Sequence, residues 1–215
     1  MSLDLLQIAS KKIIDITPKI NSKMAVFPGD TPFQEEFVMD FKSGHNLTLS
    51  NIKTTVHLGA HTDAPSHYHA DGVSIDQRSL HYYLGKAQVI EVETKKNHRI
   101  TPQDFNTEIK APRVLFKTKS FPDPYQWTND FMSFSAELIE YLNSKKVILV
   151  GIDTPSVDLA TDRILQSHTA IHEFNMAILE GIVLDHVEPG LYDLIALPLN
   201  IEGADATPVR AILIK

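Results

Sequence analysis

Short apolar runs separated by turn-forming residues are the feature that most constrains the fold of this chain. The runs are rich in Val and Ile and are bounded by Gly, Pro, Asn or Asp, a pattern typical of buried β-strands. They lie at residues 12–16, 47–49, 87–92, 113–116, 146–150, 177–179, 193–197 and 209–214. Helical patterns are fewer, and they predict helices that begin at 101–104, at 135–142 and at about 161–174. We therefore expect an α/β fold, with a mixed sheet that curls towards a barrel and a few flanking helices.

The composition is that of an ordinary globular protein of 215 residues, with 43% hydrophobic and 22% charged residues. Because no repeat or low-complexity linker interrupts the sequence, we expect a single domain over 1–215, with 1–10 as an N-terminal extension. The 27 acidic residues outnumber 20 Lys and Arg, which argues against nucleic acid or a membrane surface as the main partner. With no signal peptide or long apolar segment, the expected location is the cytoplasm.

The chain has no cysteine but ten histidines. Disulfides, thiolate metal sites and a cysteine nucleophile are therefore excluded. Four of the histidines fall between His57 and His69, and histidine is both the commonest metal ligand and the side chain that most easily exchanges protons near neutral pH. This segment is the natural candidate for a functional site.

The spacing within the segment favours an extended chain over a helix. Gly59 and Pro65 oppose a helix, whereas His57, His61, Asp63 and His67 are separated by even numbers of residues. An extended backbone would send these side chains to one side. Imidazoles together with a carboxylate suit Zn²⁺, or Mn²⁺ where the geometry is more open.

Glu180 is a second unusual residue, because it interrupts the apolar run 177–184. A buried carboxylate is costly unless a cation or a metal accompanies it. We interpret Glu180 as a metal ligand, the alternative being an edge strand that faces water. His69 and His81 carry no such signal and are interpreted as ordinary surface histidines.

Several motifs together resemble one known family. Residues 57–67, His-Leu-Gly-Ala-His-Thr-Asp-Ala-Pro-Ser-His, resemble the signature of the metal-dependent cyclase-like hydrolases, which include the bacterial kynurenine formamidases. The signature usually has Thr where this chain has Ala60. Further elements of the family are matched by 27–32, Phe-Pro-Gly-Asp-Thr-Pro, by 151–158, Gly-Ile-Asp-Thr-Pro-Ser-Val-Asp, and by the tail from Leu184 to Ala211.

The resemblance implies a set of site residues. Two metal ions, Zn²⁺ or alternatively Mn²⁺, would be held by His57, His61, Asp63, His168 and Glu180. Asp63 and Glu180 would bridge the two ions, and His67 would shuttle protons. The family usually has His-His where this chain has His168-Thr169, and His172, one helical turn on, is a candidate substitute.

The resemblance also implies the fold and the reaction. The fold would be the swivelling β/β/α type, and the activity would be hydrolysis of N-formyl-L-kynurenine to L-kynurenine and formate in tryptophan catabolism. Phe27 stands where the formamidases have a Trp that contacts the substrate ring. The partner would be a small aromatic formamide, and the assembly a homodimer or a larger homo-oligomer. Two alternatives stay open: another amidase or lactamase of the family, such as one that opens isatin-type rings, and a metal-binding module without catalysis.

Overall fold

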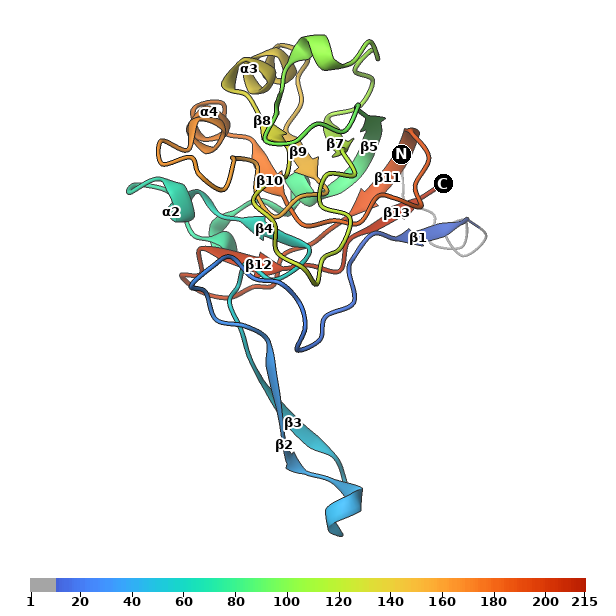
Figure 1. Ribbon diagram of the computed structural model, residues 1–215, viewed down its shortest axis with the longest axis vertical. Helices are drawn as coiled ribbons and strands as arrows, with labels where there is room; N and C mark the ends of the chain where they lie inside the picture. Colours follow the sequence, from blue (N-terminus) through green and yellow to red (C-terminus); the bar gives the residue numbers. More distant parts are fainter. Residues whose placement is uncertain (1–10) are drawn as a thin grey trace.

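The core of the protein is one curled seven-stranded sheet, seen in the computed structural model, which describes residues 11–215 (Figure 1). The strand order is β1-β13-β11-β5-β7-β9-β10. Neighbours from β1 to β5 in this order pair antiparallel, and those from β5 to β10 pair parallel. The strands are β1 (Ile13–Asp15), β5 (Leu84–Glu91), β7 (Arg113–Lys117), β9 (Leu149–Ile152), β10 (Ala177–Leu179), β11 (Gly190–Ile195) and β13 (Ile212–Ile214). The predicted mixed, curled sheet is confirmed.

Smaller elements surround this sheet. Three two-stranded sheets pair β2 (Gln34–Met39) with β3 (Leu49–Lys53), β4 (His61–Asp63) with β12 (Ala206–Pro208), and β6 (Arg99–Ile100) with β8 (Ser133–Phe134). The α-helices are α2 (Pro65–Tyr68), α3 (Ala136–Ser144) and α4 (Gln166–Glu173). Single 3₁₀ turns are η1 (Phe41–Ser43), η2 (Ile75–Gln77), η3 (Leu80–Tyr83) and η4 (Pro102–Asp104).

Alternate residues of the central strands feed two separate hydrophobic cores. In β7, Leu115 belongs to one core, whereas Val114 and Phe116 belong to the other. The second core is completed by the apolar faces of α3 and α4, which lie on the same side of the sheet (Figure 1). A strand buried on both faces reads as a continuous apolar run, which is why the central strands could be recognised in the sequence.

The helix predictions are confirmed at one place and corrected at two. Ser135 caps α3 as expected, because its hydroxyl accepts the backbone N–H of Leu138 at 3.0 Å. The predicted helix at 161–174 begins only at Gln166, since Leu165 before it has a left-handed backbone, φ +54°. The predicted helix at 101–104 is only the 3₁₀ turn η4; the backbone turns extended at Phe105 and ends it.

Two predicted strands begin later in the structure than in the sequence prediction. Lys146 has a positive φ of +66°, so the run predicted at 146–150 becomes a strand only from Leu149. The run at 47–49 contributes only its last residue, Leu49, to β3. Its partner β2 was not predicted, because its sequence mixes acidic and apolar residues.

Strands β2 and β3 form a hairpin that projects far from the rest of the molecule (Figure 1).

No helix in the described part of the chain is long and apolar enough to cross a membrane. The N-terminal extension expected at 1–10 lies outside the described residues, and the single-domain organisation over 1–215 stays a prediction.

Candidate metal centre and active site

The five side chains predicted as metal ligands converge on one place beside strand β10. His61 and Asp63 lie on β4, and His57 lies in the bend that precedes it. Glu180 follows β10 directly, and two backbone hydrogen bonds join it to His61, from His61 N to Glu180 O at 3.1 Å and from Glu180 N to His61 O at 2.9 Å. His168 reaches the same place from α4.

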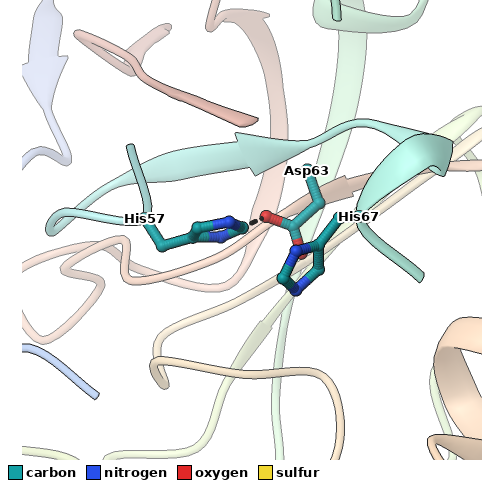
Figure 2. Close-up of side chains that lie close together, drawn as sticks. All are labelled: His57, Asp63 and His67. Carbon is teal, nitrogen blue, oxygen red and sulfur yellow. Dashed lines mark ion pairs between the residues drawn. The ribbon is translucent and has the colours of Figure 1, made fainter. Parts of the chain in front are cut away.

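Asp63 lies at the centre of this cluster, and its carboxylate is buried. Its Oδ1 lies 3.0 Å from Nδ1 of His57, the contact drawn in Figure 2, and 3.5 Å from Nε2 of His61. Its Oδ2 lies 3.5 Å from Nε2 of His168. The second carboxylate, Glu180, places Oε2 3.1 Å from Nε2 of His61. Two carboxylates therefore lie between three imidazoles.

The extended geometry predicted for 57–67 is correct only for β4. Pro65 was expected to oppose a helix but begins the short helix α2, because proline is well suited to a first helical turn. His67 consequently lies on a helix, and His57 lies in a bend. The even spacing was therefore not the reason that these side chains meet. A tight turn at Gly59, with φ +57°, brings His57 back towards His61, and the Gly59 carbonyl accepts Nδ1–H of His61 at 2.8 Å.

The water-exposed alternative for Glu180 is wrong, because its side chain is only 3% exposed. Its Oε1 accepts the backbone N–H of Val157 at 2.6 Å. One oxygen is thus fixed by the backbone while the other faces His61. A buried carboxylate held in this way is suited to receive a cation.

Asp158 orients His168, a role that the sequence analysis missed. Its Oδ2 accepts Nδ1–H of His168 at 2.8 Å, and its carboxylate also accepts the backbone N–H groups of Ser167 and His168. Arg99 donates from Nη1 to the other oxygen of Asp158 at 2.8 Å. The hydrogen bond from Nδ1–H of His168 to Asp158 fixes the tautomer of the imidazole and leaves its Nε2 facing Asp63. The Pro-Ser-Val-Asp motif was the available signal, but its final Asp was not given a role.

Asp205, just before β12, holds the two histidines at the open side of the cluster. Its Oδ2 lies 3.1 Å from Nε2 of His57 and 3.3 Å from Nδ1 of His67. The His67 side chain is 35% exposed, and its ring lies 4.2 Å from the ring of His57, centroid to centroid (Figure 2). No sequence pattern indicated Asp205, because it enters the cluster only through the pairing of β12 with β4.

The electrostatics of the cluster favour added positive charge. Burial alone would lower the pKa of His57, but contacts with Asp63 and Asp205 raise that pKa to about 9. Burial also opposes the charged form of His168, yet its hydrogen bond to Asp158 and its contact with Asp63 raise the pKa to about 10. Burial would raise the pKa of Asp63, but His168 and His57 hold it well below its usual range. Protons on the imidazoles thus balance charge that a metal could balance instead.

Two buried polar atoms test whether a metal fits here. Asp63 Oδ1 and His168 Nε2 are buried and make no hydrogen bond of good geometry within residues 11–215, although ion-pair partners lie 3.0 Å and 3.5 Å away. Unpartnered buried polar atoms are costly, and metal coordination would satisfy them. Two groups of side chains have ligand atoms within 4.8 Å of one another: His57, Asp63 and His67, and His61, Asp63 and Glu180. Asp63 belongs to both groups, and this set of imidazoles and carboxylates is of the kind that binds divalent cations.

The cluster forms one wall of a cavity of about 470 Å³. Another part of the cavity lining is an aromatic wall that includes Phe27, Phe121 and Trp127. Asp153 also lines this cavity at the carboxyl end of β9, and burial raises its pKa to about 6. The carboxyl ends of parallel strands are the usual place for ligands in α/β sheets. The cavity therefore combines a metal-ligating wall with a wall suited to an aromatic ring.

The remaining histidines of interest lie outside this cavity. His172 stacks on His69 with ring centroids 3.8 Å apart, and it lines a separate, smaller cavity. Its position does not support a role as substitute ligand. His69 and His81 are exposed, in line with their interpretation as surface residues.

Comparison with known proteins adds the family to this geometry. The Cyclase family model matches residues 14–159. The chain belongs to the Cyclase family. It is 40% identical over 205 residues to the kynurenine formamidase of Bordetella avium (strain 197N), which covers 94% of this chain and 98% of that protein. The kynurenine formamidase of Bordetella petrii is 38% identical over the same share of each chain.

Two solved structures share the fold of this chain. A protein described as a predicted metal-dependent hydrolase from Bacillus stearothermophilus superposes with a TM-score of 0.79 at 25% identity, covering 95% of this chain and 98% of that one. Isatin hydrolase A from Ralstonia solanacearum superposes with a TM-score of 0.82 at 22% identity, covering 97% and 94%. Together with the formamidase relatives, these similarities identify the chain as a hydrolytic enzyme, as predicted.

Proposed function

We propose that this enzyme hydrolyses N-formyl-L-kynurenine to L-kynurenine and formate, a step of tryptophan catabolism. The observation that carries the proposal is the cavity, whose lining combines the histidine and carboxylate cluster with an aromatic wall. A substrate with an aryl ring and a formamide carbonyl matches both walls. The 40% identity to a kynurenine formamidase over 94% of the chain supports the same substrate.

The cofactor proposed is a pair of divalent cations, Zn²⁺ or alternatively Mn²⁺, held by His57, His61, Asp63, His168 and Glu180. When bound, such cations lower the pKa of water and polarise a carbonyl. The protein supplies the order of the site: Asp158 fixes the ring of His168, and the Gly59 carbonyl fixes the ring of His61. These contacts hold Nε2 of both imidazoles towards the carboxylates.

His67 is proposed as the proton shuttle. Asp205 accepts Nδ1–H of His67, which leaves Nε2 free to take a proton from the attacking water. The same nitrogen then gives that proton to the departing aryl amine as the C–N bond breaks. Partial exposure of the ring lets it reach substrate in the open cavity.

The second candidate function is opening of an isatin-type ring. It is favoured by the shared fold with isatin hydrolase A and by Phe27, whose smaller ring replaces the Trp expected of a formamidase. The third alternative, a metal-binding module without catalysis, would bind cations but hydrolyse nothing.

A substrate panel distinguishes these functions. Purified enzyme reconstituted with Zn²⁺ or Mn²⁺ would be assayed on N-formyl-L-kynurenine, isatin and phenyl acetate, with release of formate, isatinate or acetate as the readout. We expect kcat/KM for N-formyl-L-kynurenine to exceed that for isatin by at least about tenfold, since one matched contact is worth about 1.4 kcal/mol. The reverse ranking would favour ring opening, and no turnover in any assay would favour the non-catalytic module.

We further propose that the enzyme is a homodimer or a larger homo-oligomer, and that it works in the cytoplasm. The support for assembly is the projecting hairpin β2–β3, which pairs only with itself among the described strands. Its apolar side chains are exposed, with Ile52 67% and Phe37 57% exposed. Isolated two-stranded hairpins are marginally stable, and exposed apolar patches indicate interfaces. A second copy carries an identical arm, so two arms can cover each other about a two-fold axis.

A further inference from the structure

The aromatic wall of the cavity contains a residue to which no role has been given. Trp127 is the only tryptophan of the chain, and it lies on the segment between β7 and β8. Its ring meets the ring of Phe27 edge to face, with centroids 5.2 Å apart and an interplanar angle of 74°. Both residues line the cavity that holds His57, Asp63 and Glu180. An indole therefore lies beside Phe27, although it comes from a distant part of the chain.

Trp127 is held in place from behind. Its ring packs edge to face on Phe121 and Phe131, with centroids 6.0 Å away in each case. Phe131 is fully buried and anchors the cluster to the core. The indole N–H donates to Oδ1 of Asn129 at 2.7 Å, so the polar atom of the ring is satisfied within its own loop. A tryptophan fixed in this way offers a preorganised apolar surface at little entropic cost.

The two segments of the wall are also joined by their backbones. The N–H of Ala25 donates to the carbonyl of Pro124 at 3.0 Å. The hydroxyl of Tyr125 donates to the carbonyl of Lys19 at 2.7 Å. These bonds keep the segment that carries Phe27 against the one that carries Trp127. The wall is thus one surface, and Phe27 does not contact a ligand alone.

We propose that Trp127 determines the specificity of this enzyme for substrates with an aromatic ring. This role rests on the function proposed above. Trp127 and Phe27 together contact the aryl ring of the substrate, and the histidine cluster faces its carbonyl. Because the ring of Phe27 is small, it leaves part of the substrate's aryl ring uncovered, and the indole of Trp127 covers that part. Loss of Trp127 therefore weakens binding of aryl amides and leaves alkyl amides nearly unaffected, because aromatic pairs gain energy beyond their buried area.

The single tryptophan gives a direct binding assay. Acetanilide is an aryl amide whose absorption does not overlap tryptophan emission, and N-cyclohexylacetamide is its non-aromatic counterpart. Titration of the metal-loaded enzyme with acetanilide is expected to change the emission of Trp127 with saturation, and N-cyclohexylacetamide is expected to change it much less. Equal responses to the two amides, or none to either, would overturn the proposal.

Kinetics of variants give the second test, with formanilide and N-cyclohexylformamide as substrates. Trp127→Leu is expected to raise KM for formanilide about tenfold, the size of one aromatic contact, and to change KM for N-cyclohexylformamide less than about twofold. Trp127→Phe should lie between. Adding Phe27→Trp to Trp127→Leu should restore much of the loss by returning an indole to the wall. Gln126→Ala, at an exposed position of the same loop that does not line the cavity, is the control for general disturbance of the loop.

The outcomes separate this inference from the proposed function. Equal losses on both substrates in Trp127→Leu, or no loss on formanilide, would overturn the role of Trp127 even if N-formyl-L-kynurenine is hydrolysed well. A selective response to acetanilide in an enzyme that does not hydrolyse N-formyl-L-kynurenine would support the aromatic site while removing the proposed substrate.

Discussion

At the scale of single residues, Asp63 is the side chain on which the proposed metal centre depends. It contacts His57, His61 and His168, and one of its oxygens has no hydrogen-bond partner in the described part of the chain. Asp63→Asn should lose metal and activity together, because an amide cannot bridge two cations as an anion does. Metal analysis should fall from about two equivalents towards zero. Asp185→Asn is the matched control, because Asp185 lines the same cavity but is exposed and contacts none of the proposed ligands, and it should keep its metal. A metal-loaded, active Asp63→Asn would contradict the assignment.

His67 separates proton transfer from metal binding. His67→Ala should keep its metal and lose about 10²–10⁴-fold in kcat, the usual cost of a lost general acid–base group. The structure sharpens this test, because His67 also lies within ligand distance of His57 and Asp63. Loss of metal in His67→Ala would make it a ligand instead. His69→Ala removes a nearby exposed imidazole that stacks on His172, and it should change neither metal content nor rate.

At the scale of elements, the turn after β10 positions Glu180 against the histidine segment. Gly181 has φ +63°, and a Cβ added there would lie 2.1 Å from the carbonyl oxygen of Gly59. Only glycine allows this close approach. Gly181→Ala must therefore push β10 and the 57–61 segment apart.

The expected result for Gly181→Ala is a loss of both thermal stability and metal affinity. Gly203→Ala is the matched control, because Gly203 also has a positive φ, +74°, but no atom within 4 Å of the added Cβ. Gly203→Ala should lower the free energy of unfolding by only about 1 kcal/mol, the cost of backbone strain, and should keep its metal. Equal melting temperatures and metal contents for the two variants would show that the contact with Gly59 does not matter.

At the scale of the whole molecule, protons and metal compete for the same cluster. In the metal-free protein the pKa values of His57 and His168 are raised from 6.5 to about 9 and about 10, with burial opposing and the neighbouring carboxylates favouring the charged forms. The two raised pKa values add to the free energy of unfolding. This contribution is complete below pH 6.5 and is lost as the pH rises through 9 to 10. Metal needs neutral imidazoles, so its affinity rises over the same range.

The difference in melting temperature between Mn²⁺-loaded and chelator-treated enzyme should therefore widen from pH 6 to pH 9. Other titrating groups contribute to both forms and largely cancel in the difference. Asp63→Asn should show little difference at any pH. A difference that is constant or narrows with rising pH would argue against these imidazoles as ligands.

The hairpin β2–β3 gives a test of assembly at the same scale. Ile52→Ser, at an exposed position of the arm, should shift the enzyme towards the monomer in analytical ultracentrifugation, because it removes apolar surface from the proposed interface. Ile164→Ser is the control, since Ile164 is 82% exposed on the body of the protein. An Ile52→Ser variant with unchanged mass would place the interface elsewhere.

Local patterns along the chain were enough to predict part of the fold and some of the site residues. Strands such as β10 and the helix α3 could be predicted because burial on both faces gives an unbroken apolar run and because Ser135 is a good helix cap. Glu180 could be singled out because a carboxylate in an apolar run needs a partner. Residue types also restricted the chemistry, since imidazoles and carboxylates without thiols favour a hydrolytic metal centre.

Which of these residues meet depends on how distant elements pack against one another. His168 and Glu180 reach β4 because the parallel strands bring α4 and the end of β10 to one edge of the sheet, a result of strand order that no local spacing contains. Asp205 and Trp127 were missed for the same reason, because each contacts a residue far away in the chain. Such contacts are set by how elements cross and not by the residues on either side. Asp158 is different, since it lies only ten residues before His168.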